Sequence, residues 1–271
     1  MEDEAVTRST APASRDSLCR DLRALGVEPG MALIVHSSMS RLGCVAGGAH
    51  AVVLALLDAV GGTGTLVMPA HSTQLTDPAS WRNPPVPEDW WEAVRDTLPA
   101  FDPLLTPTRG MGAVVECFRH VPGARRSAHP HYSFAAWGRH AEEVVADHAL
   151  EGGLGERSPL ARVYDIGGWV LLLGVGNENN TSFHLAEYRS DYPGKALVTV
   201  GAPVMVDGER RWVLLQELAL NSDDFGEIGR AFAAIPGMVR RGSVGRGEAL
   251  LMPQRAAVDF ATGWIREHRG G

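Results

Sequence analysis

Apolar residues follow two patterns along the first seventy residues. Apolar side chains at spacings of four and three predict an amphipathic helix that begins at Ser14 and ends at Gly26. Unbroken apolar runs at 31–36 (MALIVH) and 65–69 (TLVMP) are typical of strands that are buried on both faces. A helix is expected between them, at 49–60. A strand, a helix and a second strand in this order predict two parallel strands of one sheet.

The rest of the chain continues this α/β pattern. The run at 169–174 (WVLLLG) predicts a third buried strand, and Asp207-Gly208 between the apolar runs 197–206 and 211–215 predicts a hairpin. Further elements are expected as helices at 88–98, 112–119, 160–163, 181–189, 223–235 and 253–269, and as a strand at 133–137. The sequence thus predicts one composite α/β/α domain with a mostly parallel central sheet and a C-terminal hairpin plus helices.

One stretch, 70–110, departs from this pattern. It is rich in proline, including Pro84-Pro85, and it contains three tryptophans. A long excursion of this kind in an α/β domain is typically a lid or a binding loop, so we expect a substrate-side insertion; a rigid surface elaboration is the alternative. Residues 1–13 are expected to form a disordered tail before the domain at 14–271.

The charge balance limits the kinds of partner. The chain has 25 Lys and Arg residues against 32 Asp and Glu residues, which gives a net charge of −7 and a pI near 5.8. Such a chain lacks the basic excess of a broad nucleic-acid or anionic-membrane surface, but it suits a small cationic partner.

Its three cysteines are widely spaced and form no CxxC pair, so neither a disulfide framework nor a zinc knuckle is expected. The acidic N-terminus and the lack of a run of about 18 apolar residues predict a cytoplasmic protein without a membrane span.

The first candidate site is His36-Ser37-Ser38-Met39-Ser40, which lies between a buried strand and a Gly-rich turn. In open α/β sheets, ligands bind beyond the carboxyl ends of the strands. Free backbone N–H groups and three hydroxyl groups at this place suit a phosphate or pyrophosphate, whereas an ordinary Ser-rich capping loop is the alternative. Neither a GxxxxGK[ST] loop nor a GxGxxG loop occurs in the chain.

The second candidate site is His184 with Glu187, on the helix expected at 181–189. A spacing of three residues places the two side chains on one helix face. A carboxylate beside an imidazole fixes its tautomer and supports the imidazolium, as a general base requires. An inert pair on the helix surface is the alternative. A metal site is less expected, because HxxE lacks the further ligands of a zinc motif.

Two further segments carry polar groups that suit a site. His129, which Pro130 restricts to an extended conformation, is expected either to orient a loop by hydrogen bonding or to lie in a polar turn. Asp223 and Asp224 are expected either to cap a helix or to join Asp77 in binding the ammonium groups of a polyamine substrate. No GxSxG elbow is present, so covalent catalysis is not favoured.

Four segments, taken together, resemble the aminoglycoside 3-N-acetyltransferase family: VHSSMSRLG, TLVMPA, RSAHPHYSFAAWG and NNTSFHLAEYR, in that order. The resemblance extends from about Ser14 to His268. It implies an acetyl-CoA-dependent N-acetyltransferase with an α/β/α fold that differs from the GNAT fold. It also implies an antibiotic-resistance activity on aminoglycosides and no metal cofactor.

The resemblance further implies roles for single residues. His184 matches the family's catalytic histidine and Glu187 its neighbouring carboxylate, while His129 supports the site. Asp223 and Asp224 fall where relatives place acidic substrate contacts. The remaining implied residues bind CoA, with the pyrophosphate at His36, Ser37, Ser38 and Ser40 and the pantetheine arm along Thr108, Arg109, Gly110, Met111, Gly112 and Ser158.

The function expected from all of this is acetyl transfer to the 3-amine of 2-deoxystreptamine aminoglycosides. Direct transfer in a ternary complex, with His184 as general base, is the expected mechanism. The alternatives are a family member that acetylates a different amine and a CoA-binding protein without aminoglycoside activity. A metal-dependent hydrolase that uses His36, His71, His129 or His184 is a further alternative. The sequence leaves the oligomeric state open.

Overall fold

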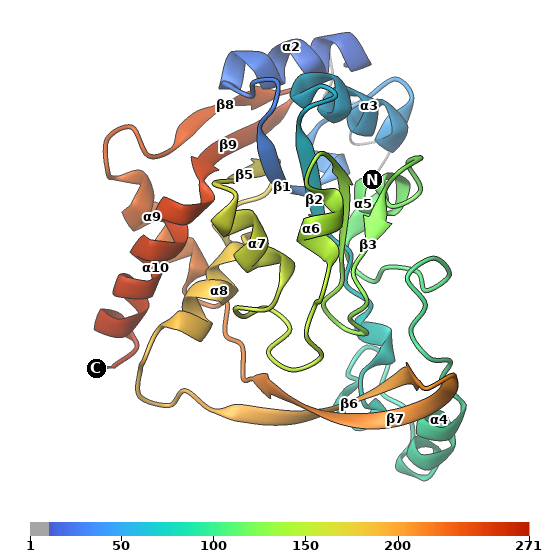
Figure 1. Cartoon of the computed structure of the whole chain (residues 1–271). Coiled ribbons are helices and arrows are strands. Elements are labelled where there is room, and N and C mark those ends of the chain that lie inside the picture. The colour runs from blue at the N-terminus through green and yellow to red at the C-terminus, as the bar shows by residue number, and fades with distance from the viewer. Residues whose placement is uncertain (1–10, 271) are drawn as a thin grey trace.

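The computed structural model describes residues 11–270, and these form a seven-stranded sheet with helices on both faces (Figure 1). The strand order in the sheet is β3-β4-β2-β1-β5-β9-β8. The strands are β1 (Ala32–Ser37), β2 (Thr65–Pro69), β3 (Arg125–Arg126), β4 (Phe134–Gly138), β5 (Trp169–Leu173), β8 (Arg240–Val244) and β9 (Gly247–Pro253).

The centre of this sheet is parallel. Strand β1 pairs in parallel with β2 on one side and with β5 on the other. Strands β4 and β9 pair antiparallel with their neighbours, so five of the seven described strands point in one direction. Most strands therefore run in the same direction, as expected for a mostly parallel sheet. The strand pairs outside the centre are antiparallel.

Two layers of helices cover the sheet, and each buries its own apolar core. One face carries α2 (Arg15–Leu25), α3 (Gly48–Val60) and α5 (Gly112–Phe118). The other face carries α6 (Ala141–Val145), α7 (Pro159–Asp165), α8 (Ser182–Arg189), α9 (Phe225–Ala233) and α10 (Gln254–His268). The result is the expected single α/β/α domain. Within residues 11–270, no helix combines the length and the apolar character that crossing a membrane requires.

Local sequence explains where the first described helix begins and ends. Ser14 and Ser17 form a capping box at the start of α2, in which each hydroxyl accepts the other residue's backbone N–H. Gly26 ends the helix with a φ of 104°, a left-handed conformation that glycine adopts without steric cost. Ala13 forms a β-bridge to the loop before α3, so ordered structure begins before the boundary expected at Ser14. Residues 1–10 of the expected tail lie outside the described residues.

Several elements differ from the sequence prediction. The helix expected at 88–98 is divided into a 3-10 turn and the helix α4 (Trp91–Thr97). Strands β3, β8 and β9 occupy positions for which the sequence pattern predicted no strand. Thr181 stands at the N-cap of α8 without a capping bond, and the Asn180 side chain accepts the Ser182 N–H in its place. Short 3-10 turns are η1 (Met39–Arg41), η2 (Thr73–Leu75), η3 (Pro78–Ser80), η4 (Glu88–Trp90) and η5 (Asn177–Asn179).

A two-stranded hairpin lies along the lower edge of Figure 1, separate from the main sheet. Asp207 and Gly208 have positive φ angles of 52° and 80°, as the expected two-residue turn requires. The Arg210 guanidinium donates to the Leu98 carbonyl at 3.0 Å, so the hairpin packs against the insertion at 70–110. The two strands are β6 (Leu197–Val206) and β7 (Glu209–Leu218).

Candidate active site

Two loops meet at the carboxyl edge of the parallel centre of the sheet. Strand β1 ends at Ser37 and β5 ends at Leu173, and the parallel register places these two residues side by side. The Ser38 N–H donates to the Leu173 carbonyl at 2.9 Å, which holds the loop after β1 against the end of β5. The polar runs at 36–40 and 174–181 therefore lie together, where open α/β sheets bind their ligands.

Helix α8 carries the candidate base. Nδ1 of His184 lies 2.5 Å from Oε2 of Glu187, one helical turn away. The Glu187 side chain is completely buried, whereas 16% of the His184 side chain is exposed. Because an ionised carboxylate only accepts hydrogen bonds, Nδ1 is the donor, and Nε2 of the neutral imidazole is left as an acceptor.

The second oxygen of the Glu187 carboxylate is also engaged. Oε1 accepts the Asn221 N–H at 3.0 Å and a bond from Nη1 of Arg269 at 2.5 Å. Arg269 follows α10, and it also donates two hydrogen bonds of 2.6 Å to Asp224. Glu187 is therefore held by α8, by the loop before α9 and by the end of α10.

His184 faces a cavity of about 230 Å³, which we call the base pocket. His36 and His71 also line it. Burial, with a smaller contribution from His184, lowers the pKa of His36 to about 3 and lowers the pKa of His71 well below its ordinary value. Both imidazoles are thus neutral near pH 7, and His36 offers hydrogen bonds but no positive charge. The other lining residues are Val35, Ser37, Pro69, Gly110, Met111, Val115, Val175, Glu178, Asn179, Thr181, Ser222 and Phe225.

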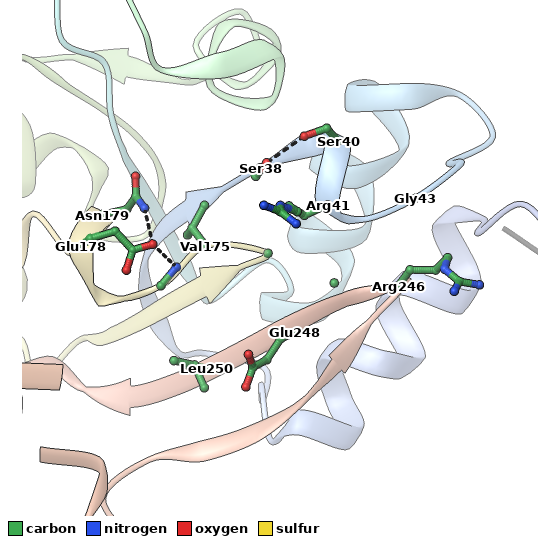
Figure 2. Close-up of a pocket in the computed structure, with 13 residues that line it drawn as sticks. Ser38, Ser40, Arg41, Gly43, Val175, Glu178, Asn179, Arg246, Glu248 and Leu250 are labelled. Carbon is green, nitrogen blue, oxygen red and sulfur yellow. Dashed lines mark hydrogen bonds between the residues drawn. The ribbon is translucent and has the colours of Figure 1, made fainter. Parts of the chain in front are cut away.

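Two larger cavities share lining residues with the base pocket. The apolar channel, of about 840 Å³, is lined by the loop after β1 and the start of α5, and it shares Ser37, Gly110 and Met111 with the base pocket. The arginine pocket, of about 640 Å³, shares Ser38 and Ser40 with the channel (Figure 2). Together the three cavities follow the carboxyl edge of the sheet.

The arginine pocket takes its name from Arg41 and Arg246, which both line it (Figure 2). Within the part of the chain that the structure describes, neither guanidinium has an ion-pair partner. Ser38 and Ser40 also line the pocket, and their hydroxyl groups lie 3.2 Å apart. The Glu178 carboxylate also lines this pocket and accepts a backbone N–H at 3.0 Å. A pocket lined by two arginines and two serine hydroxyl groups suits phosphate oxygens.

The expected CoA-binding residues fall into three places. Those on the apolar channel are Ser37, Ser38, Ser40, Gly110, Met111 and Gly112. His36 lies on the base pocket instead, as a neutral imidazole. Thr108, Arg109 and Ser158 line none of the three cavities. The expected cofactor set is therefore only partly brought together.

The three residues outside these cavities hold loops by their side chains. The Thr108 hydroxyl donates to Glu116 at 2.8 Å. The Arg109 guanidinium donates to a backbone carbonyl of the insertion at 3.0 Å. The buried Ser158 hydroxyl donates to the Gly155 carbonyl at 2.6 Å, at the start of α7. These bonds give each residue a local structural contact.

The carboxylates expected to bind a polyamine lie in different surroundings. Asp77 pairs with Arg95 at 2.9 Å inside the insertion, and Asp224 pairs with Arg269. Asp223 is exposed. Two of these three carboxylates thus have an arginine partner.

His129 lies in the buried loop before β4. Its Nδ1 accepts the backbone N–H groups of His131 at 3.1 Å and of Tyr132 at 3.0 Å, so the imidazole holds this loop. Its Nε2 lies 3.5 Å from Glu217 of the hairpin. His129 does not line the base pocket, the apolar channel or the arginine pocket.

Sequence reasoning did not single out three arginines of the site. Arg41 follows the Ser-rich run directly and Arg246 lies in the turn between β8 and β9, a turn that the sequence pattern did not predict. No local sequence pattern indicates the contact of Arg269 with Glu187, because the two residues are 82 positions apart. Among residues 11–270, no three His, Cys, Asp or Glu side chains are placed to hold a metal ion.

Comparison with known proteins identifies relatives over nearly the whole chain. The profile of the family described as aminoglycoside 3-N-acetyltransferase matches residues 34–266. The chain is 47% identical over 261 residues to the SPbeta prophage-derived aminoglycoside N(3')-acetyltransferase-like protein YokD of Bacillus subtilis (strain 168), and the match covers 96% of this chain and 95% of YokD. It is 39% identical to aminoglycoside N(3)-acetyltransferase VII of Streptomyces paromomycinus, over 98% of this chain and 96% of that protein.

Solved structures of related proteins match the fold of this chain. The crystal structure of YokD matches with a TM-score of 0.95 and 44% identity, over 98% of each chain. AAC-IIIb as a binary complex with CoASH matches with a TM-score of 0.84 and 34% identity, over 96% of this chain and 98% of that one. AAC-VIa bound to sisomicin matches with a TM-score of 0.85 and 32% identity, over 96% of this chain and all of that one. By fold and by sequence, the chain belongs to the aminoglycoside 3-N-acetyltransferase family.

Proposed function

We propose that the protein transfers the acetyl group of acetyl-CoA to the 3-amine of a 2-deoxystreptamine aminoglycoside, with His184 as the general base. The observation that carries this proposal is the 2.5 Å contact between His184 and the buried Glu187. His184 faces a pocket that shares lining residues with the apolar channel. A base, a route for a long thioester arm and a place for an amine are thus adjacent.

The role of His184 follows from its tautomer. The Nδ1–H group of His184 donates a hydrogen bond to Glu187, so the free lone pair of the imidazole lies on Nε2. An attacking amine must lose a proton, because its ammonium form has no lone pair. Glu187 stabilises the imidazolium that forms when Nε2 takes this proton.

The cavities suggest how acetyl-CoA lies. The apolar channel suits the pantetheine arm, with its thioester end at the base pocket. The phosphates of the nucleotide end lie at the arginine pocket, where Arg41 and Arg246 meet them. A CoA-bound structural neighbour, AAC-IIIb with CoASH, supports this choice of co-substrate.

The transfer step is direct, with both substrates bound. The amine nitrogen attacks the thioester carbonyl carbon while its proton passes to Nε2 of His184. The C–S bond then breaks and an amide is formed. The sulfur leaves with the electron pair and takes the proton back from Nε2 of His184, which gives the CoA thiol and restores the neutral imidazole. The residues of this chain supply the base and the orientation, and no covalent enzyme intermediate is needed.

A cationic aminoglycoside is the amine that fits best. The chain has a net charge of −7, and the structural neighbour AAC-VIa is described as bound to sisomicin. YokD, which is 47% identical, is described as acetyltransferase-like, so a different cationic amine is the second candidate. In either case the chemistry at His184 is the same.

A thiol-release assay tests the proposal. With acetyl-CoA and a panel of 2-deoxystreptamine aminoglycosides, we expect wild-type protein to release CoA thiol and to give a product acetylated at the 3-amine by NMR. His184→Ala should lower kcat about 10²–10⁴-fold, because one positioned base is removed, and should leave acetyl-CoA binding unchanged. Full kcat in this variant contradicts the base assignment. No turnover with any aminoglycoside, but turnover with other amines, favours the second candidate.

A further inference from the structure

Arg269 lies at the end of α10, but its side chain reaches the catalytic helix. Its guanidinium donates to Glu187 at 2.5 Å, to both oxygens of Asp224 at 2.6 Å and to the Asn221 carbonyl at 2.7 Å. Only 10% of the Arg269 side chain is exposed. All of these bonds use the planar fork of the guanidinium, which a lysine cannot reproduce.

The contact with Arg269 stabilises the buried charge of Glu187. An ionised carboxylate that is fully buried is costly unless it is paired and hydrogen-bonded. Burial disfavours the charge of Arg269 as well, but its hydrogen bonds with Asp224 and Glu187 outweigh this and raise the pKa of Arg269. Arg269 therefore stays charged and keeps one Glu187 oxygen fixed, so that the other remains aimed at His184.

We propose that Arg269 is a positioning residue for the acetyl-transfer reaction, which holds Glu187 in place for His184 and is itself held by Asp224. The inference rests on the proposed role of His184 as base. It changes the expected role of Asp224 from substrate contact to support of the base. Arg269 touches neither the base pocket nor the other two cavities, so it acts through Glu187.

The charged groups around His184 determine in which direction loss of Arg269 shifts the pH dependence of kcat. Ionisable groups face this cluster and the base pocket from β1, the segment after β2, η5, α8, the loop after α8, the start of α9 and the end of α10. They are His36, His71, Glu178, His184, Glu187, Tyr192, Asp224 and Arg269. His36 and His71 are neutral. Removal of Arg269 leaves two carboxylates without their cation, so the histidine–carboxylate pair binds a proton more tightly. The base then becomes free only at higher pH.

The test compares three variants in the thiol-release assay across pH. Arg269→Ala should lower kcat about 10- to 100-fold, since loss of alignment by about 1 Å costs on the order of 10²-fold, and should move the acid limb of the kcat profile to higher pH. Arg269→Lys should keep the acid limb in place, because the charge remains, but should not restore full kcat. Arg266→Ala is the matched control, because Arg266 lies exposed on the same helix and has no partner among the described residues.

Three outcomes overturn the inference, two of them kinetic and one spectroscopic. The first is kcat within twofold of wild type in Arg269→Ala. The second is a lowered kcat with an unmoved acid limb, which indicates general loosening of α10. Proton NMR of the His184 Nδ1–H gives a readout without substrate: this resonance should shift in Arg269→Ala and stay in Arg266→Ala. If wild-type protein acetylates nothing, the proposed function fails, while an unshifted resonance refutes the positioning role independently.

Discussion

Replacement of Glu187 by glutamine is the sharpest single test of the site. The Glu187 carboxylate accepts bonds from three donors: Nδ1 of His184, Nη1 of Arg269 and the Asn221 N–H. A glutamine amide has one oxygen and one NH₂ group, so its NH₂ group must face either His184 or the two donors at the other oxygen, Arg269 and the Asn221 N–H. If it faces His184, the imidazole must carry its proton on Nε2, and the nitrogen that should accept the amine proton is blocked.

The magnitude follows from this geometry. A wrong tautomer of the same kind in a Ser-His-Asp triad lowers kcat about 10⁴-fold, so we expect kcat of Glu187→Gln to fall about 10²–10⁴-fold, which is about 3–5 kcal/mol of transition-state stabilisation. Loss of one buried acceptor should also lower the free energy of unfolding by about 1–3 kcal/mol. Thiol release and urea unfolding measure the two effects separately.

The chain contains a matched control for this substitution. His140 and Glu143 have the same three-residue spacing and a 3.0 Å contact, but their side chains are 34% and 57% exposed. Glu143→Gln should leave both kcat and unfolding unchanged within error, because an exposed pair contributes little. If Glu187→Gln behaves like Glu143→Gln, the reasoning that makes His184 the base is refuted.

Three further predictions concern binding and pH. Arg41→Gln and Arg246→Gln should each raise the KM of acetyl-CoA several-fold with little change in kcat. The increase in KM should be smaller for acetyl-dephospho-CoA, which lacks the 3′-phosphate. An equal increase for both thioesters contradicts the placement of the 3′-phosphate in the arginine pocket. Glu178→Gln should raise the KM of a cationic amine more than Asp77→Asn does, because Asp77 is already paired with Arg95. A larger KM increase in Asp77→Asn, measured by steady-state kinetics, contradicts this prediction. Burial lowers the pKa of His36, His131 and His148 to about 3 or 4 and that of His71 well below its ordinary value, so the unfolded chain binds more protons than the folded chain near pH 5. The free energy of unfolding should therefore fall as the pH is lowered, by up to about 5 kcal/mol per pH unit near pH 5. Denaturant titrations at pH 7 and pH 5 check this slope for the four buried histidines, and a flat profile contradicts it.

The central part of the fold was predictable because it depends on local apolar pattern. Strands β1, β2 and β5 are unbroken apolar runs, and a strand buried on both faces allows no other composition. The hairpin turn was predictable because Asp207-Gly208 suits two consecutive positive φ angles. In both cases the physical requirement lies within a few residues of the chain.

The flanking strands were not predictable for the opposite reason. Strand β8 is the exposed sheet edge with the sequence RRGSV, whose burial and composition resemble those of a loop. Strand β3 has only two residues, and both are arginine. Their backbone pairing with β9 and β4 comes from tertiary contacts, which override weak local propensity.

The candidate site divides in the same way. His184 and Glu187 share one helix face, so their contact was predictable from spacing alone. The pairing of Asp224 with Arg269 was not, because those residues are 45 positions apart and helix capping explained Asp224 equally well. The sequence also could not show that burial keeps His36 neutral, so that its imidazole offers a phosphate no positive charge.

The charge balance around His184 gives a reason for this long-range arrangement. Glu187, Asp224 and Arg269 form one hydrogen-bonded cluster with two negative charges and one positive charge. In the proposed reaction His184 takes a proton from the amine, and the group of four then becomes neutral overall. A buried cluster with one uncompensated negative charge favours uptake of that proton, whereas a second arginine would oppose it. One arginine shared by two carboxylates therefore keeps Glu187 in place and still leaves the negative charge that the imidazolium requires.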